Sequence, residues 1–283
     1  MKRINHFFAW LLSFLPDRAF TKLTFILKHR KFPNLKNPVL FNEKLLYLKL
    51  TDRDDLYKIL VDKYMVREFI KNKIGDEYLI PLIGHYDNAN EIPFEQLPDK
   101  FALKLTNGSQ HNIICKDKND IDWAKSKKII NKWLKYDFYK RTREWPYKDK
   151  KSKIVIEQYM VDSQGHLNDF KFWCFNGQPE FVEIDSERFY NHKRDFYNIE
   201  FNHKLPFYIS HKHSESSFTK PINYEKMVEI VKILAKGLRY VRIDLYNIDG
   251  KIYFGEFTFY PGNCNEPIKP KLYEKTFGSL IQV

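Results

Sequence analysis

Two runs of alternating apolar and polar residues flank an Asp-Gly pair within residues 242–262, and this pattern is the strongest constraint on the fold. Alternation with period two is typical of a β-strand, and Asp-Gly between two such runs is typical of a hairpin turn. Arg242 and Asp244 then share one face of the first strand, and Glu256 and Thr258 share one face of the second. Lone carboxylates are rare inside strands, so these charges require partners.

The register of the hairpin decides whether the two acids meet, because a shift of one residue moves a side chain to the other face. We predict a three-residue loop at residues 248–250, with its glycine in the left-handed conformation. This loop pairs Asn247 with Lys251 and places Asp244 and Glu256 on one face.

Two carboxylates on one face repel each other unless a cation lies between them. Carboxylate oxygens suit Mg²⁺, which usually stays partly hydrated in proteins and is bound together with phosphate groups. A buried ion network of both acids with Arg242 and nearby lysines is the alternative. The hairpin favours the metal site and leaves the ion network open.

The chain has 283 residues, enough for one large domain or two closely associated subdomains. Its 48 Lys and Arg residues against 36 Asp and Glu residues favour anionic partners such as nucleotides, phospholipid headgroups, acidic sugars or nucleic acid. A solvated basic surface explains the same charge equally well. Three scattered cysteines without CxxC spacing argue against a disulfide framework or a zinc site and indicate a reducing, cytoplasmic compartment.

The first 20 residues contain a short apolar run at residues 7–15 after a basic start. The run is too short to span a bilayer, which takes about 20 residues. No small-residue cleavage site follows it, so a signal peptide is not favoured. We expect a helix packed on the domain, with an interfacial helix at the inner face of a membrane as the alternative.

The remaining pattern predicts a mixed α+β chain. Helical spacing of apolar residues extends to about residue 75 and returns at residues 223–237, and another helix begins at Asp120 or Asp122. Residues 101–106 form a predicted strand. Three further apolar runs are predicted to be adjacent antiparallel strands; they are residues 154–160, 169–175 and 179–184.

Two segments are candidates for binding a nucleotide. Lys104 precedes a polar stretch with Gly108 and Ser109, whose backbone N–H groups suit phosphate oxygens, although an ordinary hairpin turn explains the stretch as well. Glu157 ends an apolar strand whose continuation is able to present main-chain groups to a purine. An ordinary strand end is an equally good interpretation of that segment.

Five stretches in this order resemble the TupA-like family of ATP-grasp enzymes, named for a teichuronopeptide biosynthesis protein. They are FNEKLLYLKL, LVDKYMVREFI, FALKLTNGSQHNIICKDK, DFKFWCFNGQPEFVEID and RIDLYNIDGKIYFGEFTFYPG. The resemblance covers nearly the whole chain. It implies an ATP-grasp fold, in which two α+β subdomains at residues 76–155 and 156–283 sandwich the nucleotide and an N-terminal helical region occupies residues 1–75.

The resemblance also implies an ATP site. Lys104 and Arg67 are expected to contact the phosphates, with Arg67 in place of the family's lysine. The loop expected to close over the phosphates comprises Gly108, Ser109, Gln110, His111 and Asn112. The hinge expected to read adenine through its main chain comprises Glu157, Gln158, Tyr159 and Met160.

The same resemblance assigns roles in the hairpin. Asp244 and Glu256 match the acids that hold Mg²⁺. Thr258 stands where the family usually has an asparagine ligand and is a weaker oxygen donor. Arg242 matches an arginine that stabilises charge on a reacting acyl phosphate in carboxylate ligases of this fold.

These residues together predict an ATP- and Mg²⁺-dependent carboxylate–amine ligase. The family's association with surface polysaccharide suggests a uronic acid or amino-acid carboxylate on a glycan precursor as acceptor and an amine as second substrate. The residues proposed to bind the acceptor are Arg188, His192, Arg194 and Asn263, although a basic exposed loop explains the cations around residue 190 equally well. A sugar kinase and a polysaccharide glycosyltransferase are the alternative activities. A non-enzymatic basic protein is least favoured, and no nucleic-acid partner is expected.

Overall fold

The computed structural model describes residues 14–163, 165, 167–186 and 192–283. Most of the apolar run expected to form a helix at residues 7–15 lies outside these residues. Within the part of the chain that the structure describes, no helix is long and apolar enough to cross a membrane.

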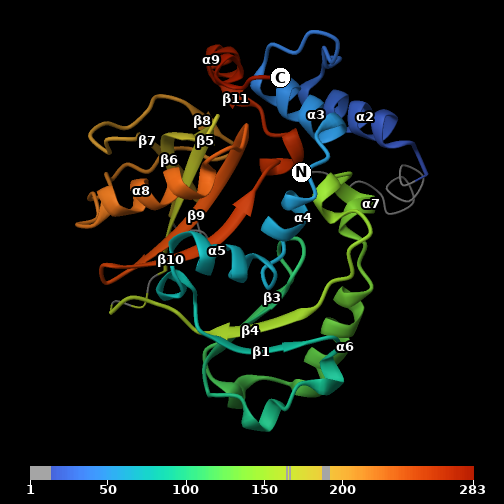
Figure 1. The fold of residues 1–283 in the computed structure, drawn as a ribbon, viewed down its shortest axis with the longest axis vertical. Helices are drawn as coiled ribbons and strands as arrows, with labels where there is room; N and C mark the ends of the chain where they lie inside the picture. The colour runs from blue at the N-terminus through green and yellow to red at the C-terminus, as the bar shows by residue number, and fades with distance from the viewer. Residues whose placement is uncertain (1–13, 164, 166, 187–191) are drawn as a thin grey trace.

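The molecule contains a large and a small antiparallel sheet, one above the other in Figure 1. The five-stranded sheet has the order β10-β9-β5-β6-β7, and the four-stranded sheet has the order β1-β4-β2-β3. The large-sheet strands are β5 (Asn168–Phe175), β6 (Gln178–Ser186), β7 (Lys193–Asn198), β9 (Tyr240–Ile248) and β10 (Lys251–Thr258). The small-sheet strands are β1 (Leu82–Tyr86), β2 (Phe101–Leu105), β3 (Asn112–Cys115) and β4 (Ile154–Gln158). A two-stranded sheet joins β8 (Tyr208–Ile209) to β11 (Ile268–Lys269).

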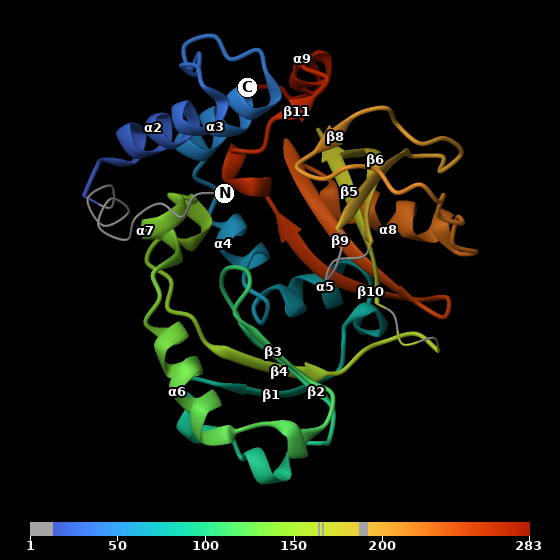
Figure 2. The same ribbon diagram turned by 180° about the vertical axis from the view of Figure 1, so that it is seen from behind.

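Over the described residues, four helices lie in the expected N-terminal helical region. They are α2 (Asp17–His29), α3 (Phe41–Thr51), α4 (Leu56–Leu60) and α5 (Val66–Ile74). The later helices are α6 (Trp123–Leu134), α7 (Phe138–Thr142), α8 (Tyr224–Ala235) and α9 (Leu272–Leu280). Asp122 caps α6, because its side chain accepts a hydrogen bond from the backbone N–H of Lys125. Helix α5 lies between the two sheets (Figure 2).

One strand expected beside β5 belongs to the other sheet. Strand β4 pairs with β1 and β2, so the prediction of three adjacent strands from residue 154 onward is wrong. Alternation predicts a strand but not its partner, and here the partners come from earlier in the chain. The expected boundary between residues 155 and 156 falls inside β4, and the small sheet stays whole only when the boundary follows Gln158.

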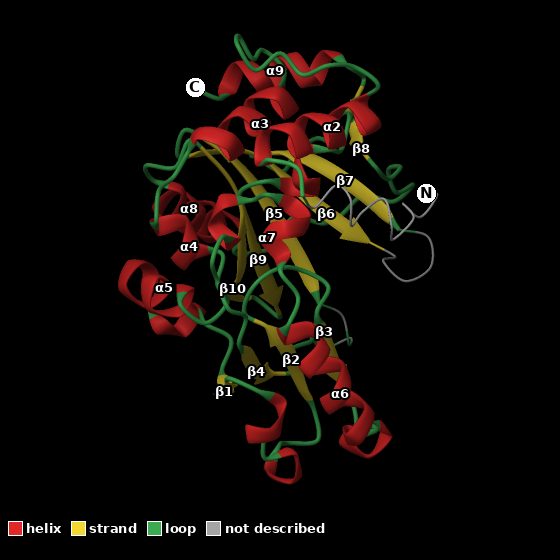
Figure 3. Ribbon diagram, turned by 90° about the vertical axis from the view of Figure 1, so that its right-hand side faces the viewer, coloured by secondary structure: helices red, strands yellow, loops and turns green. Residues whose placement is uncertain are grey.

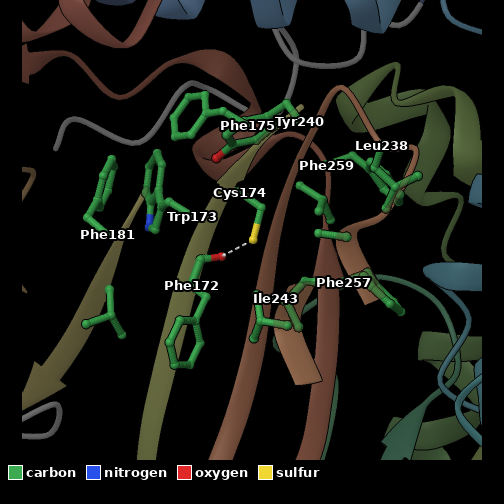
Figure 4. Packing of buried hydrophobic residues seen from close by; sticks show 14 of the residues in the cluster. Phe172, Trp173, Cys174, Phe175, Phe181, Leu238, Tyr240, Ile243, Phe257 and Phe259 are labelled. Carbon is green, nitrogen blue, oxygen red and sulfur yellow. Dashed lines mark hydrogen bonds between the residues drawn. The ribbon is translucent and has the colours of Figure 1, made fainter. Parts of the chain in front are cut away.

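Helix α8 covers one face of the large sheet with an apolar stripe. Its buried residues include Met227, Ile230, Val231 and Leu234, spaced as one face of a helix requires. Phe172 of β5 lies against Tyr224 at the start of α8, with 5.8 Å between ring centroids. Figure 4 labels side chains of both faces: Phe172 and Cys174 of β5 and Ile243 of β9 belong to the face that α8 covers, whereas Trp173, Phe175 and Tyr240 belong to the opposite face. The face that α8 covers is therefore structural.

The opposite face of the large sheet changes from aromatic to charged residues along the strands. At one end, Phe41 of α3 lies 5.7 Å from Trp173 of β5 and 6.4 Å from Phe277 of α9, measured between ring centroids. Helices α3 and α9 cover that end of the sheet (Figure 3). Two residues before Trp173, on the same face, Lys171 pairs in register with Asp244. Beyond that end, the same face carries charged residues, of which Asp169, Lys171 and Asp244 are buried.

Candidate functional site

The turn of the β9–β10 hairpin is shorter than expected. Lys251 pairs with Ile248, so only Asp249 and Gly250 lie in the loop, and the prediction of a three-residue loop is wrong. Both loop residues have positive φ, 49° and 83°, as a two-residue turn that follows the twist of the strands requires.

A β-bulge at Gly255 nevertheless brings the two acids together. In the register of the turn, Phe254 pairs with Leu245, and Glu256 would therefore oppose Ile243 on the other face. The register shifts after Phe254, so that Glu256 pairs with Asp244. The prediction that both acids share a face is confirmed, through a bulge rather than through the loop.

Arg242 lies at the centre of the hairpin's charged face. Its Nε and Nη2 atoms donate to the two oxygens of Asp244 at 2.8 Å each. The same Nη2 lies 3.4 Å from Oε1 of Glu256 and 3.2 Å from Oγ1 of Thr258. Three expected metal ligands therefore converge on one cationic nitrogen, as the ion-network alternative anticipates.

Burial and ion pairing oppose each other at this cluster. Burial raises the pKa of Asp244, and Arg242 and Lys171 act against that increase. Lys171 lies 3.7 Å from both Asp244 and Asp185 and also contacts Asp169. The cluster therefore extends across the sheet from β10 to β6.

A second charged cluster lies on the small sheet. Lys104 of β2 is 2.8 Å from Oε2 of Glu157 on β4, and Arg67 of α5 is 3.5 Å from Oε1 of the same carboxylate. Arg67 also donates to the backbone carbonyl of Ile80 at 3.0 Å. Two cations thus share one buried carboxylate, which leaves an excess of positive charge. The side chain of Glu157 thus contacts Lys104 and Arg67, the two residues that are expected to contact the phosphates of ATP.

The polar stretch after β2 forms the connection of the β2–β3 hairpin, so the turn interpretation holds for its backbone. Gly108 has φ of 82°, and its carbonyl accepts a hydrogen bond from Lys63 at 2.8 Å. Gln110 has a positive φ of 66°, Ser109 is exposed, and His111 is partly buried. Asn112 already belongs to β3, where it pairs with Lys104.

The expected hinge overlaps the end of β4, which contains Glu157 and Gln158. The backbone N–H of Gln158 donates to the carbonyl of Pro81 at 3.0 Å. Tyr159 and Met160 leave the strand, and Met160 packs against Ile80 and residues of the β9–β10 hairpin. This segment is the connection from the small sheet to the large one.

The two charged clusters lie close to each other, because Tyr246 is within electrostatic reach of Asp244, Glu256 and Glu157. The small-sheet cluster lines a cavity of about 20 Å³, whose lining includes Arg67, Lys104 and Glu157 on one side and Phe254 and Gly255, next to Glu256, on the other. It has room for about one water molecule. Burial lowers the pKa of Lys63, and Glu256 and Glu157 both oppose this decrease, so Lys63 lies within electrostatic reach of both clusters. A bound nucleotide therefore requires side chains or sheets to move apart here.

The residues proposed to bind an acceptor have defined partners. Arg194 of β7 lies 2.8 Å from Asp185 and 2.9 Å from Glu183, and His192 lies 2.9 Å from Asp185. Asp185 is also the neighbour of Lys171, so His192 and Arg194 connect to the hairpin cluster. Arg188 lies outside the described residues.

Asn263 is placed in a turn after β10. Its Oδ1 accepts a hydrogen bond from Lys49 of α3 at 2.6 Å, and its φ is 56°. Lys49 is fully buried and also donates to the carbonyl of Thr142 at 2.9 Å. Burial lowers the pKa of Lys49. The N-terminal helical region thus holds the turn that follows the hairpin.

Sequence reasoning missed several charged residues of the large sheet. Asp169 and Lys171 alternate with Phe170 and Phe172, and Glu183 and Asp185 alternate with Val182 and Ile184, as Arg242 and Asp244 do in β9. The same period-two pattern is the signal that would have identified them. Gly255 had no such signal, because a bulge does not follow from alternation.

The hairpin oxygens suit Mg²⁺. Asp244, Glu256 and Thr258 supply two carboxylates and a hydroxyl around one position that a cationic nitrogen already occupies. Hard oxygen donors of this kind select Mg²⁺ over softer metals. Among the described residues there is no group of three or more His, Cys, Asp or Glu side chains that could hold a metal ion. Thr258 supplies the third oxygen at this position, 3.2 Å from the same Arg242 nitrogen.

Solved structures to which the chain as a whole is similar include D-alanine–D-alanine ligase from Bacillus anthracis complexed with ATP, at 14% identity and a TM-score of 0.43, over 71% of this chain and 54% of that one. L-amino acid ligase from Bacillus licheniformis is 12% identical, with a TM-score of 0.42, over 88% and 57%. N5-carboxyaminoimidazole synthetase from Staphylococcus aureus, complexed with ADP, is 12% identical, with a TM-score of 0.41, over 87% and 51%. The chain spans about half the length of these proteins.

No curated protein matches the chain. The model of one protein family, TupA-like ATPgrasp, matches residues 43–282. The match begins in α3 and includes both sheets and both charged clusters. The chain therefore belongs to the TupA-like ATP-grasp family and has the α+β fold of that family.

Proposed function

We propose that this chain is an ATP- and Mg²⁺-dependent carboxylate–amine ligase. One observation carries the proposal: a cluster with excess positive charge on the small sheet lies close to a cluster with excess negative charge on the large sheet. The first suits the phosphates of ATP and the second suits a divalent cation bound to them.

Lys104, Arg67 and Lys63 would hold and orient the phosphates. Arg67 offers a planar fork that matches phosphate oxygens, and Lys104 acts as a mobile point charge. Glu157 would have to give up at least part of its contacts with both cations. The backbone of residues 158–160 is the candidate for contacting the adenine.

Asp244, Glu256 and Thr258 would hold Mg²⁺, which neutralises phosphate charge when it is bound. Arg242 would then stabilise the charge that develops as a phosphoryl group moves to the acceptor carboxylate. An amine would attack the resulting acyl phosphate, form the amide bond and release phosphate. These roles require positioned charges and no protein nucleophile.

The acceptor is proposed to be a uronic acid or an amino-acid carboxylate of a surface polysaccharide precursor. His192, Arg194 and Asn263 remain the candidates for holding it, with Arg188. Because Asp185 already contacts His192 and Arg194, an acceptor carboxylate would compete with Asp185 for them.

The test is to incubate the chain with Mg-ATP, candidate uronates or amino acids, and amines, and to follow both the nucleotide and the mass of the acceptor. ADP together with an amide product supports the ligase. ADP with a phosphosugar would support a sugar kinase instead, and UDP released from a UDP-sugar would support a glycosyltransferase. Either of these outcomes would overturn the proposed reaction while keeping the nucleotide site.

A further inference from the structure

We propose that Arg242 is the resident counter-ion of the metal-binding oxygens and makes metal binding depend on nucleotide. The inference rests on the proposed function, because it concerns the same site. Its basis is the position of the Arg242 guanidinium, which occupies the point where oxygens of Asp244, Glu256 and Thr258 converge.

The contacts of Arg242 are strong enough for this role. Two hydrogen bonds of 2.8 Å join its guanidinium to both oxygens of Asp244, which is the bidentate geometry of the strongest ion pairs. The third contact runs from Nη2 to Glu256 and the fourth to Thr258. A metal that approaches these oxygens meets a cation already in place.

The exposure of the side chains shows which metal-binding oxygens an incoming ion reaches while Arg242 is in place. The side chain of Glu256 is 39% exposed, whereas the side chains of Arg242 and Asp244 are 13% and 5% exposed. Glu256 is thus open to an incoming ion, but Asp244 lies beneath the guanidinium. Mg²⁺ binds oxygens at about 2.0–2.1 Å, so it and Arg242 exclude each other from Asp244.

The charge balance links the exchange to nucleotide. Arg242 and Mg²⁺ together bring three positive charges to two carboxylates, and Lys171 near Asp244 is already paired with Asp169. Lys63 lies within electrostatic reach of Glu256 as well. This excess of cations is unfavourable until a polyphosphate supplies negative charge and accepts the fork of Arg242. Metal and nucleotide therefore stabilise each other's binding.

The test is a titration of the nucleotide-free chain with Mn²⁺ as a substitute for Mg²⁺, with free Mn²⁺ followed by electron paramagnetic resonance. Arg242→Met is expected to bind Mn²⁺ at least tenfold more tightly than the unaltered chain. Arg242→Lys, which keeps the charge but loses the fork, is expected to fall between the two. Arg239→Met, a matched change of an exposed arginine just before β9, is expected to leave the affinity unchanged.

The double variant Arg242→Met with Asp244→Asn is expected to lose the gained affinity, which places the metal on the hairpin. Equal Mn²⁺ affinity of Arg242→Met and the unaltered chain would overturn the proposal, and the Arg242→Lys comparison decides the matter if Arg242→Met does not fold. A parallel titration of the unaltered chain with ATP and Mg²⁺ separates the two claims. Absence of ATP binding there would overturn the proposed function, whatever Mn²⁺ does.

Discussion

The two charged clusters of this molecule have opposite compositions and the same design. On the small sheet, two cations, Lys104 and Arg67, hold one carboxylate, Glu157. On the large sheet, one guanidinium, Arg242, holds two carboxylates, Asp244 and Glu256. Glu157 and Arg242 are thus the counter-ions of the minority sign that contact these groups, and each set keeps an excess charge for a ligand.

Because the two clusters have excess charges of opposite sign, we propose that each sheet binds a different part of the metal–nucleotide complex. A cationic cluster takes phosphate and an anionic cluster takes the metal bound to that phosphate. When neither phosphate nor metal is bound, Glu157 and Arg242 keep the buried charges of their clusters paired. This pairing lowers the free-energy cost of burying those charges. Glu157 and Arg242 must both change partners when the ligand binds.

The largest expected effect comes from removing a cation of the small sheet. Lys104→Gln is expected to weaken ATP binding by about 10- to 100-fold, because a hydrogen bond to a charged group contributes about 1.5–3 kcal/mol. Isothermal titration calorimetry measures the change. Lys116→Gln, on an exposed lysine just after β3, is the control and should bind ATP normally. Equal binding by both variants would remove Lys104 from the phosphate site.

Changing an acid of the large sheet should act on the metal alone. Asp244→Asn is expected to abolish the increase in ATP affinity that Mg²⁺ causes while leaving metal-free binding within about threefold, since one carboxylate ligand is lost. Titrations with Mg²⁺ and with EDTA give the two values. Asp249→Asn changes an aspartate in the turn of the same hairpin, where Asn-Gly is also favoured, and should retain the Mg²⁺ effect.

A smaller effect is expected from the bulge. A Cβ at Gly255 would lie 2.9 Å from the backbone oxygen of Asp244, so the strands must shift. Gly255→Ala is expected to weaken Mn²⁺ binding in the presence of ADP by about tenfold, corresponding to about 1.4 kcal/mol. Gly250→Asn, at a turn position that asparagine tolerates, serves as the control. If Gly255→Ala binds Mn²⁺ as tightly as the control, the bulge does not position Glu256 for metal.

The smallest effect should come from the minority acid of the small sheet. Glu157→Gln releases Lys104 and Arg67 from a competing charge and is expected to strengthen tripolyphosphate binding by about threefold, or about 0.7 kcal/mol. Tripolyphosphate is the right probe because it lacks adenine, which the adjacent main chain is proposed to contact. Weaker tripolyphosphate binding by this variant would mean that Glu157 orients the cations rather than competing for them.

Local patterns predicted much of this structure. Alternation in residues 242–258 predicted both strands of the hairpin, and of the two predicted starts of α6, Asp120 and Asp122, the second is the N-cap. The shared face of Asp244 and Glu256 was also predictable, although the register that produces it was not. The short turn and the bulge each shift the pairing by one residue in the same direction, and a total shift of two residues keeps Glu256 on the face of Asp244.

Long-range contacts account for what the sequence did not predict. The assignment of β4 to the small sheet depends on strands that come about 50 and 70 residues earlier. The contact of Lys49 with Asn263 joins positions 214 residues apart. The pairing of Arg242 with both Asp244 and Glu256 depends on side-chain conformation, which the periodicity of the sequence does not determine. Such features require the packed molecule.

The most direct test of the account is ATP binding by the unaltered chain, measured by calorimetry with Mg²⁺ and with EDTA. The two neighbouring clusters predict that ATP binds in both conditions and at least tenfold more tightly with Mg²⁺. ATP binding of equal strength with Mg²⁺ and with EDTA, or no binding in either, would contradict the assignment of phosphate to one sheet and metal to the other.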